Sequence, residues 1–132
     1  VRDIDGERRD TVVQKIIASA HAIAERRGCE VTVEVINQDP PATCGKDVVA
    51  AVTASVEQLG LPNQVMVSRA YHDALFMAKF TSTGMIFIPC RDGVSHRPDE
   101  FASDRDIAHG VRTLGLTLAR LSYGTQNHHE EL

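Results

Sequence analysis

Side chains that can do chemistry follow two short apolar segments of this sequence. Tyr71, His72 and Asp73 come directly after residues 64–68, where a short strand would end in a turn. A phenol and an imidazole held at such a turn can donate hydrogen bonds to an anion or to a developing oxyanion. The same residues also suit a structural role, in which Asp73 caps the next helix and the other two are satisfied locally. The residue types alone leave both roles open.

His96 follows the second apolar segment, residues 85–89, in the loop Ser-His-Arg-Pro-Asp-Glu that ends at Glu100. A loop histidine beside two carboxylates suits a metal ligand and the groups that orient it. A zinc or manganese site needs three or more protein ligands, however, and the sequence has no other metal-ligand spacing. A histidine on an ordinary surface loop is the alternative.

Arg2 lies in a short extended segment at the start of the chain. Its planar guanidinium can bind a carboxylate through two parallel hydrogen bonds. The alternative is an ordinary ion pair with Asp3 or Asp5, which would contribute little.

The elements that must position these residues alternate between helices and short apolar strands. Residues 7–27 have the periodicity of a helix, with Asp5 as its cap and Gly28 as its stop. Within residues 30–36, Val31, Val33 and Val35 fall on one face and Thr32 and Glu34 on the other, which is typical of a half-buried strand. The alternation of elements predicts an α/β architecture. We predict further helices at residues 46–59 and 72–80 and one that opens at residues 103–106, and further strands at residues 1–4, 64–68 and 85–89.

The segment Asn-Gln-Asp-Pro-Pro, residues 37–41, marks a predicted domain boundary. Two successive prolines cannot continue a strand ladder, and they form a stiff extended connection. We therefore divide residues 1–39 from residues 40–132. A part of roughly 40 residues cannot bury a self-sufficient core, so we expect residues 1–39 to belong to a larger sheet.

The composition argues against two broad classes of partner. A net charge of -4 gives no basis for general binding of nucleic acid or of a membrane surface. No apolar run reaches the roughly 20 residues that span a bilayer. The three cysteines are scattered and odd in number, which favours reduced thiols over a disulfide framework. We therefore expect neither a nucleic-acid nor a membrane partner.

Four segments, taken in order, resemble one family along almost the whole chain. They are Val-Arg-Asp-Ile-Asp at the start, Ser-Arg-Ala-Tyr-His-Asp-Ala at residues 68–74, Gly-Met-Ile-Phe-Ile-Pro at residues 84–89 and Ser-His-Arg-Pro-Asp-Glu at residues 95–100. They are similar to the C-terminal part of the hydantoinase/carbamoylase branch of the M20 metallopeptidase-like amidohydrolases. That branch includes N-carbamoyl-L-amino acid, allantoate and ureidoglycolate amidohydrolases. Arg69 and Tyr71, where most carbamoylases and allantoate enzymes have glycine, favour the ureidoglycolate enzymes.

The resemblance implies a role for each residue that matches a family motif. Arg2 matches the arginine that binds the substrate carboxylate, and Tyr71 and His72 match the turn that contacts the substrate. His96 matches the histidine that completes a two-metal site. No catalytic residue is expected in this chain, because the general base and the other metal ligands belong to the upstream half. The implied fold is the C-terminal part of an α/β catalytic domain, residues 40–132, preceded by the end of a smaller α+β lid and dimerisation domain, residues 1–39.

The implied reaction is hydrolysis of a C–N bond in a linear ureide. The expected substrate is (S)-ureidoglycolate, and glyoxylate, ammonia and carbon dioxide are the eventual products. Two divalent metal ions are implied, manganese first, with zinc, nickel or cobalt as alternatives, and so is a homodimer that pairs through the lid. The isolated chain is expected to be inactive. An allantoate amidohydrolase or an N-carbamoyl-L-amino acid hydrolase stays open as an alternative, as does a non-catalytic dimerisation or ligand-binding remnant. The compartment stays open between the cytoplasm for a bacterial protein and the endoplasmic reticulum for a plant-like one.

Overall fold

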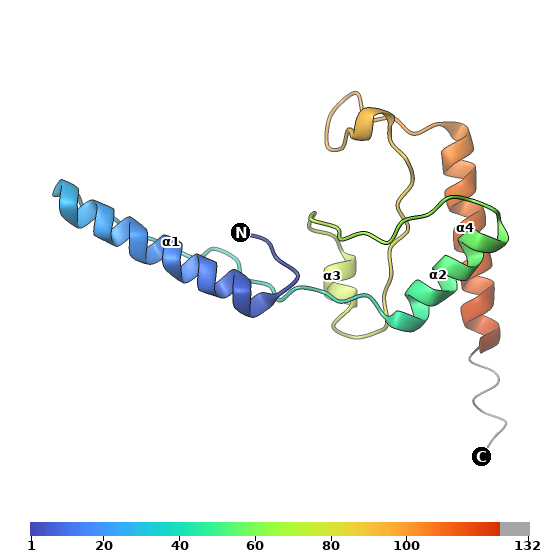
Figure 1. The fold of residues 1–132 in the computed structure, drawn as a ribbon, viewed down its shortest axis with the longest axis horizontal. Coiled ribbons are helices and arrows are strands. Elements are labelled where there is room, and N and C mark those ends of the chain that lie inside the picture. Colours follow the sequence, from blue (N-terminus) through green and yellow to red (C-terminus); the bar gives the residue numbers. More distant parts are fainter. Residues whose placement is uncertain (125–132) are drawn as a thin grey trace, which may run out of the picture. The chain divides into compact units, whose positions relative to one another are not determined.

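The computed structural model describes residues 1–124, in which helices are the main regular elements (Figure 1). These residues fall into two compact units. The first consists of Val1–Thr43 and Met66–Lys79, and the second of Cys44–Val65 and the chain from Phe80 onward. The second unit is therefore built from two separate segments of the chain, one before and one after Met66–Lys79.

Helix α1 (Gly6–Arg27) begins and ends where the sequence predicts. The Asp5 carboxylate accepts a hydrogen bond from the backbone N–H of Arg8 at 3.0 Å, which satisfies one of the free donors of the first turn. Gly28 closes the helix with a φ of 62°, and its N–H donates to the carbonyl of Glu25 at 3.2 Å. Glycine suits this position because a side chain disfavours the left-handed backbone. The predicted helix and both of its caps are confirmed.

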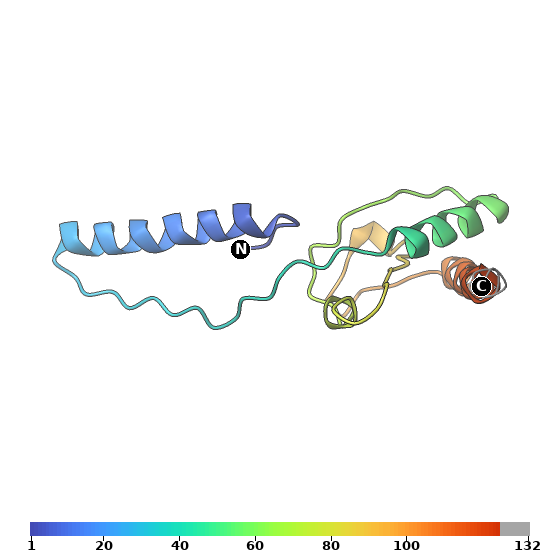
Figure 2. The same ribbon diagram turned by 90° about the horizontal axis from the view of Figure 1, so that it is seen from below.

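After α1 the chain turns and runs back along the helix, as Figures 1 and 2 show. The structure assigns no strand to residues 30–36, and the three valines of this segment are between 36% and 51% exposed. The strand prediction is therefore wrong for these residues, and so is the one for residues 1–4. A strand ladder needs a partner strand for its backbone N–H and C=O groups, and no segment within residues 1–124 supplies one.

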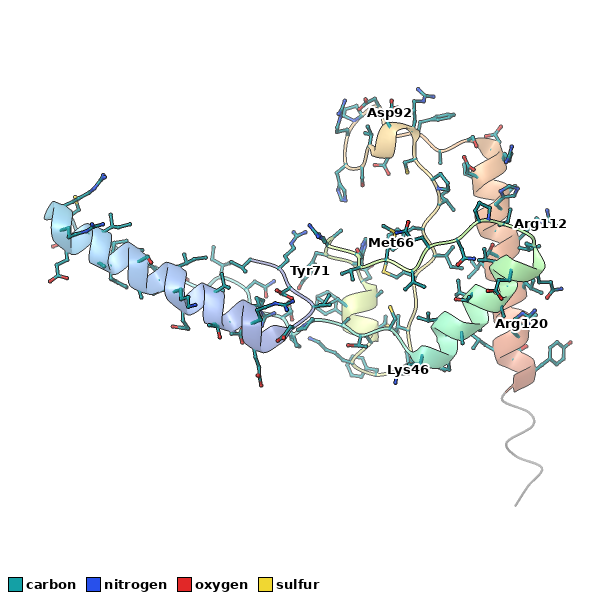
Figure 3. The ribbon with its side chains drawn as sticks, in the orientation of Figure 1. Lys46, Met66, Tyr71, Asp92, Arg112 and Arg120 are labelled. Carbon is teal, nitrogen blue, oxygen red and sulfur yellow. The ribbon has the colours of Figure 1, made fainter. Side chains whose placement is uncertain are left out.

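The rest of the first unit is a turn that leads into α3 (Ala74–Met77) and carries Tyr71 (Figure 3). The helix is a single turn, shorter than the helix predicted at residues 72–80. It ends early because the N–H of Lys79 donates to the carbonyl of Phe76, three residues back, which tightens the last turn. Asp73 precedes the helix, but its side chain makes no capping bond, so the alternative role as a helix cap is not observed.

The second unit is built on α2 (Lys46–Gln58) and α4 (Asp104–Gly124), which pack against each other. Both helices form where the sequence predicts. Gly60 follows the end of α2 in the left-handed region, with a φ of 64°. The hydroxyl of Ser103 accepts a hydrogen bond from the backbone N–H of Asp106 at 3.2 Å, so the predicted cap of α4 is present.

The most completely buried side chains of the described residues carry hydroxyl groups, and all lie on these two helices. Ser55, Thr113 and Thr117 are 0%, 2% and 3% exposed. The hydroxyls of Ser55 and Thr117 donate to the carbonyl four residues earlier, at 2.7 and 2.8 Å, so burial leaves them satisfied. No hydrophobic side chain among residues 1–124 is fully buried. The apolar faces of the helices are therefore only half covered.

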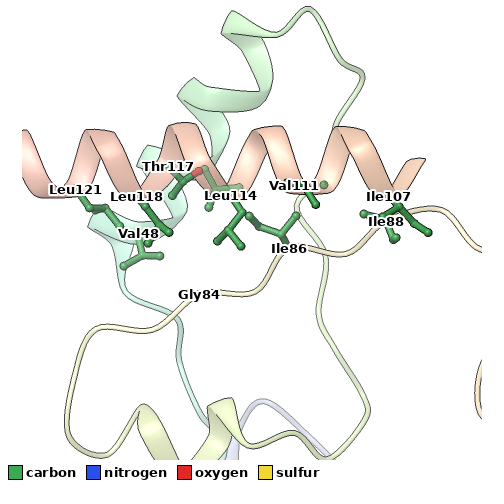
Figure 4. Close-up of a pocket in the computed structure, with 12 residues that line it drawn as sticks. Val48, Gly84, Ile86, Ile88, Ile107, Val111, Leu114, Thr117, Leu118 and Leu121 are labelled. Carbon is green, nitrogen blue, oxygen red and sulfur yellow. The ribbon is translucent and has the colours of Figure 1, made fainter. Parts of the chain in front are cut away.

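An apolar groove of about 530 Å³ lies within the second unit, along one side of α4 (Figure 4). Two glycines allow close approach there, since an added Cβ would come within 2.6 Å of a Val48 methyl at Gly84 and of an Ile88 methyl at Gly110. Apolar side chains along one face of α4 line this groove. The lining residues are Val48, Val52, Gly84, Ile86, Ile88, Ile107, Gly110, Val111, Leu114, Thr117, Leu118 and Leu121.

The strands predicted at residues 64–68 and 85–89 are also absent, because neither segment has a ladder partner in the described part of the chain. The α/β architecture is thus not confirmed within residues 1–124, which are mostly helical. The domain boundary predicted between residues 39 and 40 stays a prediction. None of the described helices combines the length and the apolar character that crossing a membrane requires.

Candidate functional site

Three of the four residues singled out in the sequence gather at one turn of the first unit. The guanidinium of Arg2 donates a hydrogen bond to the backbone carbonyl of Arg69, two residues before Tyr71. The Nε2 of His72 is hydrogen-bonded to the hydroxyl of Ser68 at 2.8 Å. The turn at residues 68–72 is therefore held by a hydrogen bond from Arg2, which is distant in the sequence, and by one within the turn between Ser68 and His72.

Tyr71 is held by a polar cluster drawn from several parts of the first unit. Its O–H donates to the carboxylate of Asp39, and the Nδ2 of Asn37 donates to the phenol oxygen at 3.3 Å. The Nζ of Lys79 lies 3.4 Å from Oδ1 of the same carboxylate. The Arg9 guanidinium donates to the backbone carbonyl of Asp39, which ties the cluster to the first turns of α1.

The ring of Tyr71 is supported on its apolar side by Phe76. The two ring centroids lie 5.7 Å apart with an interplanar angle of 73°, the edge-to-face geometry that aromatic pairs favour. The ammonium of Lys79 lies 5.3 Å from the centroid of the Phe76 ring. The phenol is thus fixed both through its oxygen and through its ring.

The hydrogen bond from Tyr71 lowers the pKa of Asp39, with further lowering from Lys79 and Asn37. A lowered carboxyl pKa means that folding favours the charged form. Its contribution to stability is therefore present above the unfolded pKa of about 3.9, and it is lost as the pH falls through the folded value. Because Asp39 is a carboxylate at neutral pH, it accepts a hydrogen bond from the O–H of Tyr71 and has no proton of its own to donate.

Arg2 does not form the ordinary ion pair that the sequence left open. Asp3 pairs instead with Arg8, whose Nε donates to Oδ2 at 2.7 Å, and this pair holds the pKa of Asp3 well below its usual range. Asp5 is the cap of α1. Within the described residues, no ion pair joins Arg2 to either carboxylate.

His96 lies in the second unit, in the left-handed region with a φ of 58°. That backbone is uncommon for a residue other than glycine, and it occurs often at functional sites. The N–H of His96 donates to Oε2 of Glu100 at 2.8 Å, and the guanidinium of Arg97 holds Asp99 through two bonds of 2.9 and 2.8 Å. Both carboxylates that follow His96 therefore fix the shape of its loop.

The base of this loop is closed by Arg91 and Phe101. The backbone N–H of Arg91 donates to the carbonyl of Phe101 at 2.8 Å, and its guanidinium carbon lies 4.2 Å from the Phe101 ring centroid. His96 is exposed, and its loop is anchored at both ends.

The described residues do not form a two-metal site by themselves. Within residues 1–124, no three His, Cys, Asp or Glu side chains come close enough together to hold a metal ion. An exposed imidazole such as His96 can provide one ligand, whereas a stable site needs three or more.

Sequence reasoning missed Asn37 and Asp39 as partners of Tyr71. Both lie in the segment that was read only as a connection, because two prolines follow them. Thirty-two residues separate Asp39 from Tyr71 along the chain, so local periodicity gave no signal of their contact. The one feature of the sequence that could have indicated this contact is that an asparagine and an aspartate lie in a segment with no helix for them to cap.

The comparisons with known proteins agree on one family. The model of the Peptidase family M20/M25/M40 matches residues 4–120. The chain is 50% identical to a ureidoglycolate hydrolase of Oryza sativa subsp. japonica over 92% of its own length and 25% of the relative's, and 34% identical to an allantoate amidohydrolase of Escherichia coli over 83% and 27%. A crystal structure of AtUAH in complex with (S)-hydroxyglycine matches with a TM-score of 0.83 and 49% identity, over 92% of this chain and 29% of that one.

The chain therefore spans about a quarter of the length of the relatives that it matches. The family match extends into both units and covers the last three of the four segments singled out above, and it begins at residue 4, within the first of them. On these grounds the chain belongs to the Peptidase family M20/M25/M40.

Proposed function

We propose that this chain is part of a metal-dependent amidohydrolase that hydrolyses (S)-ureidoglycolate. The observation that carries the proposal is the likeness to AtUAH, at 49% identity and a TM-score of 0.83, in complex with (S)-hydroxyglycine. This compound is what remains of (S)-ureidoglycolate when hydrolysis replaces the carbamoyl group on its nitrogen by hydrogen. The carbamoyl group leaves as ammonia and carbon dioxide, and loss of ammonia from (S)-hydroxyglycine gives glyoxylate. The relatives at 50% and 49% identity are both named ureidoglycolate hydrolases.

The residues of the first unit would bind the substrate and orient it. Arg2 would hold the carboxylate, since a guanidinium matches the two oxygens of that group. Tyr71 and His72 would contact the hydroxyl and ureide groups. Holding the substrate at several points fixes the scissile bond, an orientation effect worth several kcal/mol in general.

His96 would be a metal ligand of the complete protein. The family is generally metal-dependent, and we favour manganese, with zinc, nickel or cobalt as alternatives. Bound divalent ions would supply an acidified water and polarise the carbonyl of the ureide. The anchored loop of His96 supports this role, since a ligand needs a fixed direction.

The finer architecture belongs to the same proposal. We expect residues 40–132 to complete an α/β catalytic domain and residues 1–39 to be the end of an α+β lid through which the protein forms a homodimer. Exposed apolar side chains on α1 support a contact surface there, with Val12 41%, Ile16 52% and Ile23 43% exposed. Analytical ultracentrifugation of the complete protein tests the dimer, and a monomer across the concentration range would contradict it.

A second candidate within the same family is an allantoate or N-carbamoyl-L-amino acid hydrolase. Relatives with these names are 34% to 36% identical over 83% to 94% of this chain. Tyr71 argues against this second candidate, because its phenol is held by its own hydrogen bonds with Asn37 and Asp39.

The deciding experiment is a comparison of substrates with the complete protein that carries this sequence, loaded with manganese. Initial rates are measured on (S)-ureidoglycolate, allantoate and N-carbamoyl amino acids, with release of ammonia and of glyoxylate followed separately. We expect (S)-ureidoglycolate to give the highest kcat/KM. A preference for another substrate would move the protein to the second candidate, and inactivity on all three would leave a non-catalytic remnant. The isolated chain is expected to be inactive in the same assay.

A further inference from the structure

The hydrogen bonds around Tyr71 determine what its phenol can offer to a ligand. A phenol has one proton to donate and an oxygen that accepts. The proton of Tyr71 is directed at the carboxylate of Asp39, and Asn37 donates to the oxygen. A ligand that meets this oxygen therefore meets an acceptor.

Rotating the O–H toward a ligand would cost the bond to Asp39. That bond is assisted by the charge of the carboxylate, and such bonds are about twice as strong as neutral ones. Asp39 is itself held in place from two directions, by Lys79 at 3.4 Å from Oδ1 and by the guanidinium of Arg9 at its backbone carbonyl. Its side chain is only 21% exposed, so water has limited access to replace the phenol.

Asp39 also places a negative charge directly behind the phenol. A substrate carboxylate brought to Tyr71 would meet this charge and would find no donor, whereas an N–H or O–H would find an acceptor made more basic by its own bond to Asp39. Arg2, which is bound to the same turn through the carbonyl of Arg69, is a cationic group that can bind a carboxylate instead. The first unit thus offers a carboxylate one position, at Arg2, and a hydrogen-bond donor another, at the phenol oxygen of Tyr71.

We propose that Asp39 is a positioning residue of the substrate site, which accepts the hydrogen bond of the Tyr71 O–H and so leaves the phenol oxygen to accept from an N–H or O–H of the bound ureide. The inference rests on the proposed function, because it takes Tyr71 to be a substrate contact. It adds a residue from the segment of residues 37–41 to the determinants of specificity. The lowered pKa of Asp39 agrees with it, since the carboxylate stays charged and accepting at neutral pH.

A double-mutant cycle in the complete protein tests the inference. Asp39→Asn keeps the size of the side chain but gives it an amide that can also donate, and Tyr71→Phe keeps the ring but removes the oxygen. We expect each single variant to raise the KM for the ureide by about 10- to 100-fold, with a smaller change in kcat, because a hydrogen bond to the substrate is lost. The double variant should be no worse than Tyr71→Phe alone, because Asp39 acts through the phenol.

Two further variants serve as controls. Tyr123→Phe removes a phenol that is 72% exposed, and it should leave KM unchanged. Lys79→Met removes the ion pair of Asp39 but leaves its bond to Tyr71, so it should raise KM less than Asp39→Asn does, as expected of a partly exposed pair. If Lys79→Met instead reproduces Asp39→Asn, the ion pair carries the effect and the inference is overturned.

Denaturant unfolding of the four proteins of the double-mutant cycle (unsubstituted, Asp39→Asn, Tyr71→Phe and the double variant) gives a readout independent of activity. Coupling between Asp39→Asn and Tyr71→Phe in the free energy of unfolding supports the contact, and strict additivity overturns it. Additive effects on KM in an active enzyme refute the inference and leave the proposed function intact. A complete protein that hydrolyses no ureide refutes the proposed function itself, and the role of Asp39 in substrate binding with it.

Discussion

Two glycines of α4 should respond in opposite directions to the same substitution. In a helix interior, replacing glycine by alanine normally stabilises by about 0.8–1.0 kcal/mol. At Gly115 nothing lies within 4 Å of an added Cβ, so this gain should be realised. At Gly110 the added Cβ would lie 2.6 Å from Cγ2 of Ile88. That methyl is bonded directly to a branched Cβ, so it cannot move away unless the side chain or the backbone of Ile88 shifts.

Overpacking of this kind costs about 1–3 kcal/mol, which exceeds the gain in helix propensity. We therefore expect Gly110→Ala to destabilise the complete protein by about 1 kcal/mol and Gly115→Ala to stabilise it by about the same amount. Chemical denaturation with a shared slope measures both. Equal changes in the two variants would refute the close approach of α4 to residues 84–88. Metal content should also fall in Gly110→Ala, because the substitution would shift Ile88, and the segment of residues 84–88 leads into the loop of His96.

Three further predictions concern single side chains in the complete protein. Arg2→Lys should raise the KM for the ureide strongly with little change in the thermal melt, and an unchanged KM would remove Arg2 from the site. Asp47→Asn should lower the free energy of unfolding more at pH 7 than near pH 2. The hydroxyl of Ser82, at 2.6 Å, lowers the pKa of Asp47, so this stability is present above about pH 4 and is lost as the pH falls. An equal loss at both pH values would contradict this. His96→Ala should reduce bound metal, measured by emission spectroscopy, at unchanged circular dichroism, and full metal content would exclude it as a ligand.

The helices could be predicted from sequence because their signals are local. Asp5, Gly28 and Ser103 each act within four residues of the helix end that they define. The apolar spacing in α2 and α4 likewise reports a face that the same helix presents. Such signals are present before any distant contact forms. The short α3 is the exception, since its end depends on how the turn around Phe76 tightens.

The strand predictions were wrong for a different reason. Alternation in residues 30–36 indicates that the two sides of the segment meet different surroundings, but it does not provide a hydrogen-bonding partner. The same holds for the apolar run at residues 85–89, which lines the groove of the second unit without pairing.

The candidate site was predicted in part. Its residue types were visible, and the resemblance assigned them roles, but their partners depend on contacts between distant parts of the chain. The bond between Asp39 and Tyr71 and the one between Arg2 and the carbonyl of Arg69 are of this kind. The left-handed backbone of His96 could not be predicted either, because only a small share of histidines adopt it even though histidine is enriched there.

The hydroxyl-bearing side chains buried on α2 and α4 bear on how this helix pair responds to temperature. Burial of apolar surface gives folding its large heat-capacity change, and it is the term that weakens on cooling. Ser55, Thr113 and Thr117 bring little apolar surface to their contact, and Ser55 and Thr117 complete their hydrogen bonds within their own helices. These three side chains should therefore contribute less to the heat-capacity change of the second unit than the apolar side chains of α2 and α4 that line the groove, and their contacts should weaken less in the cold.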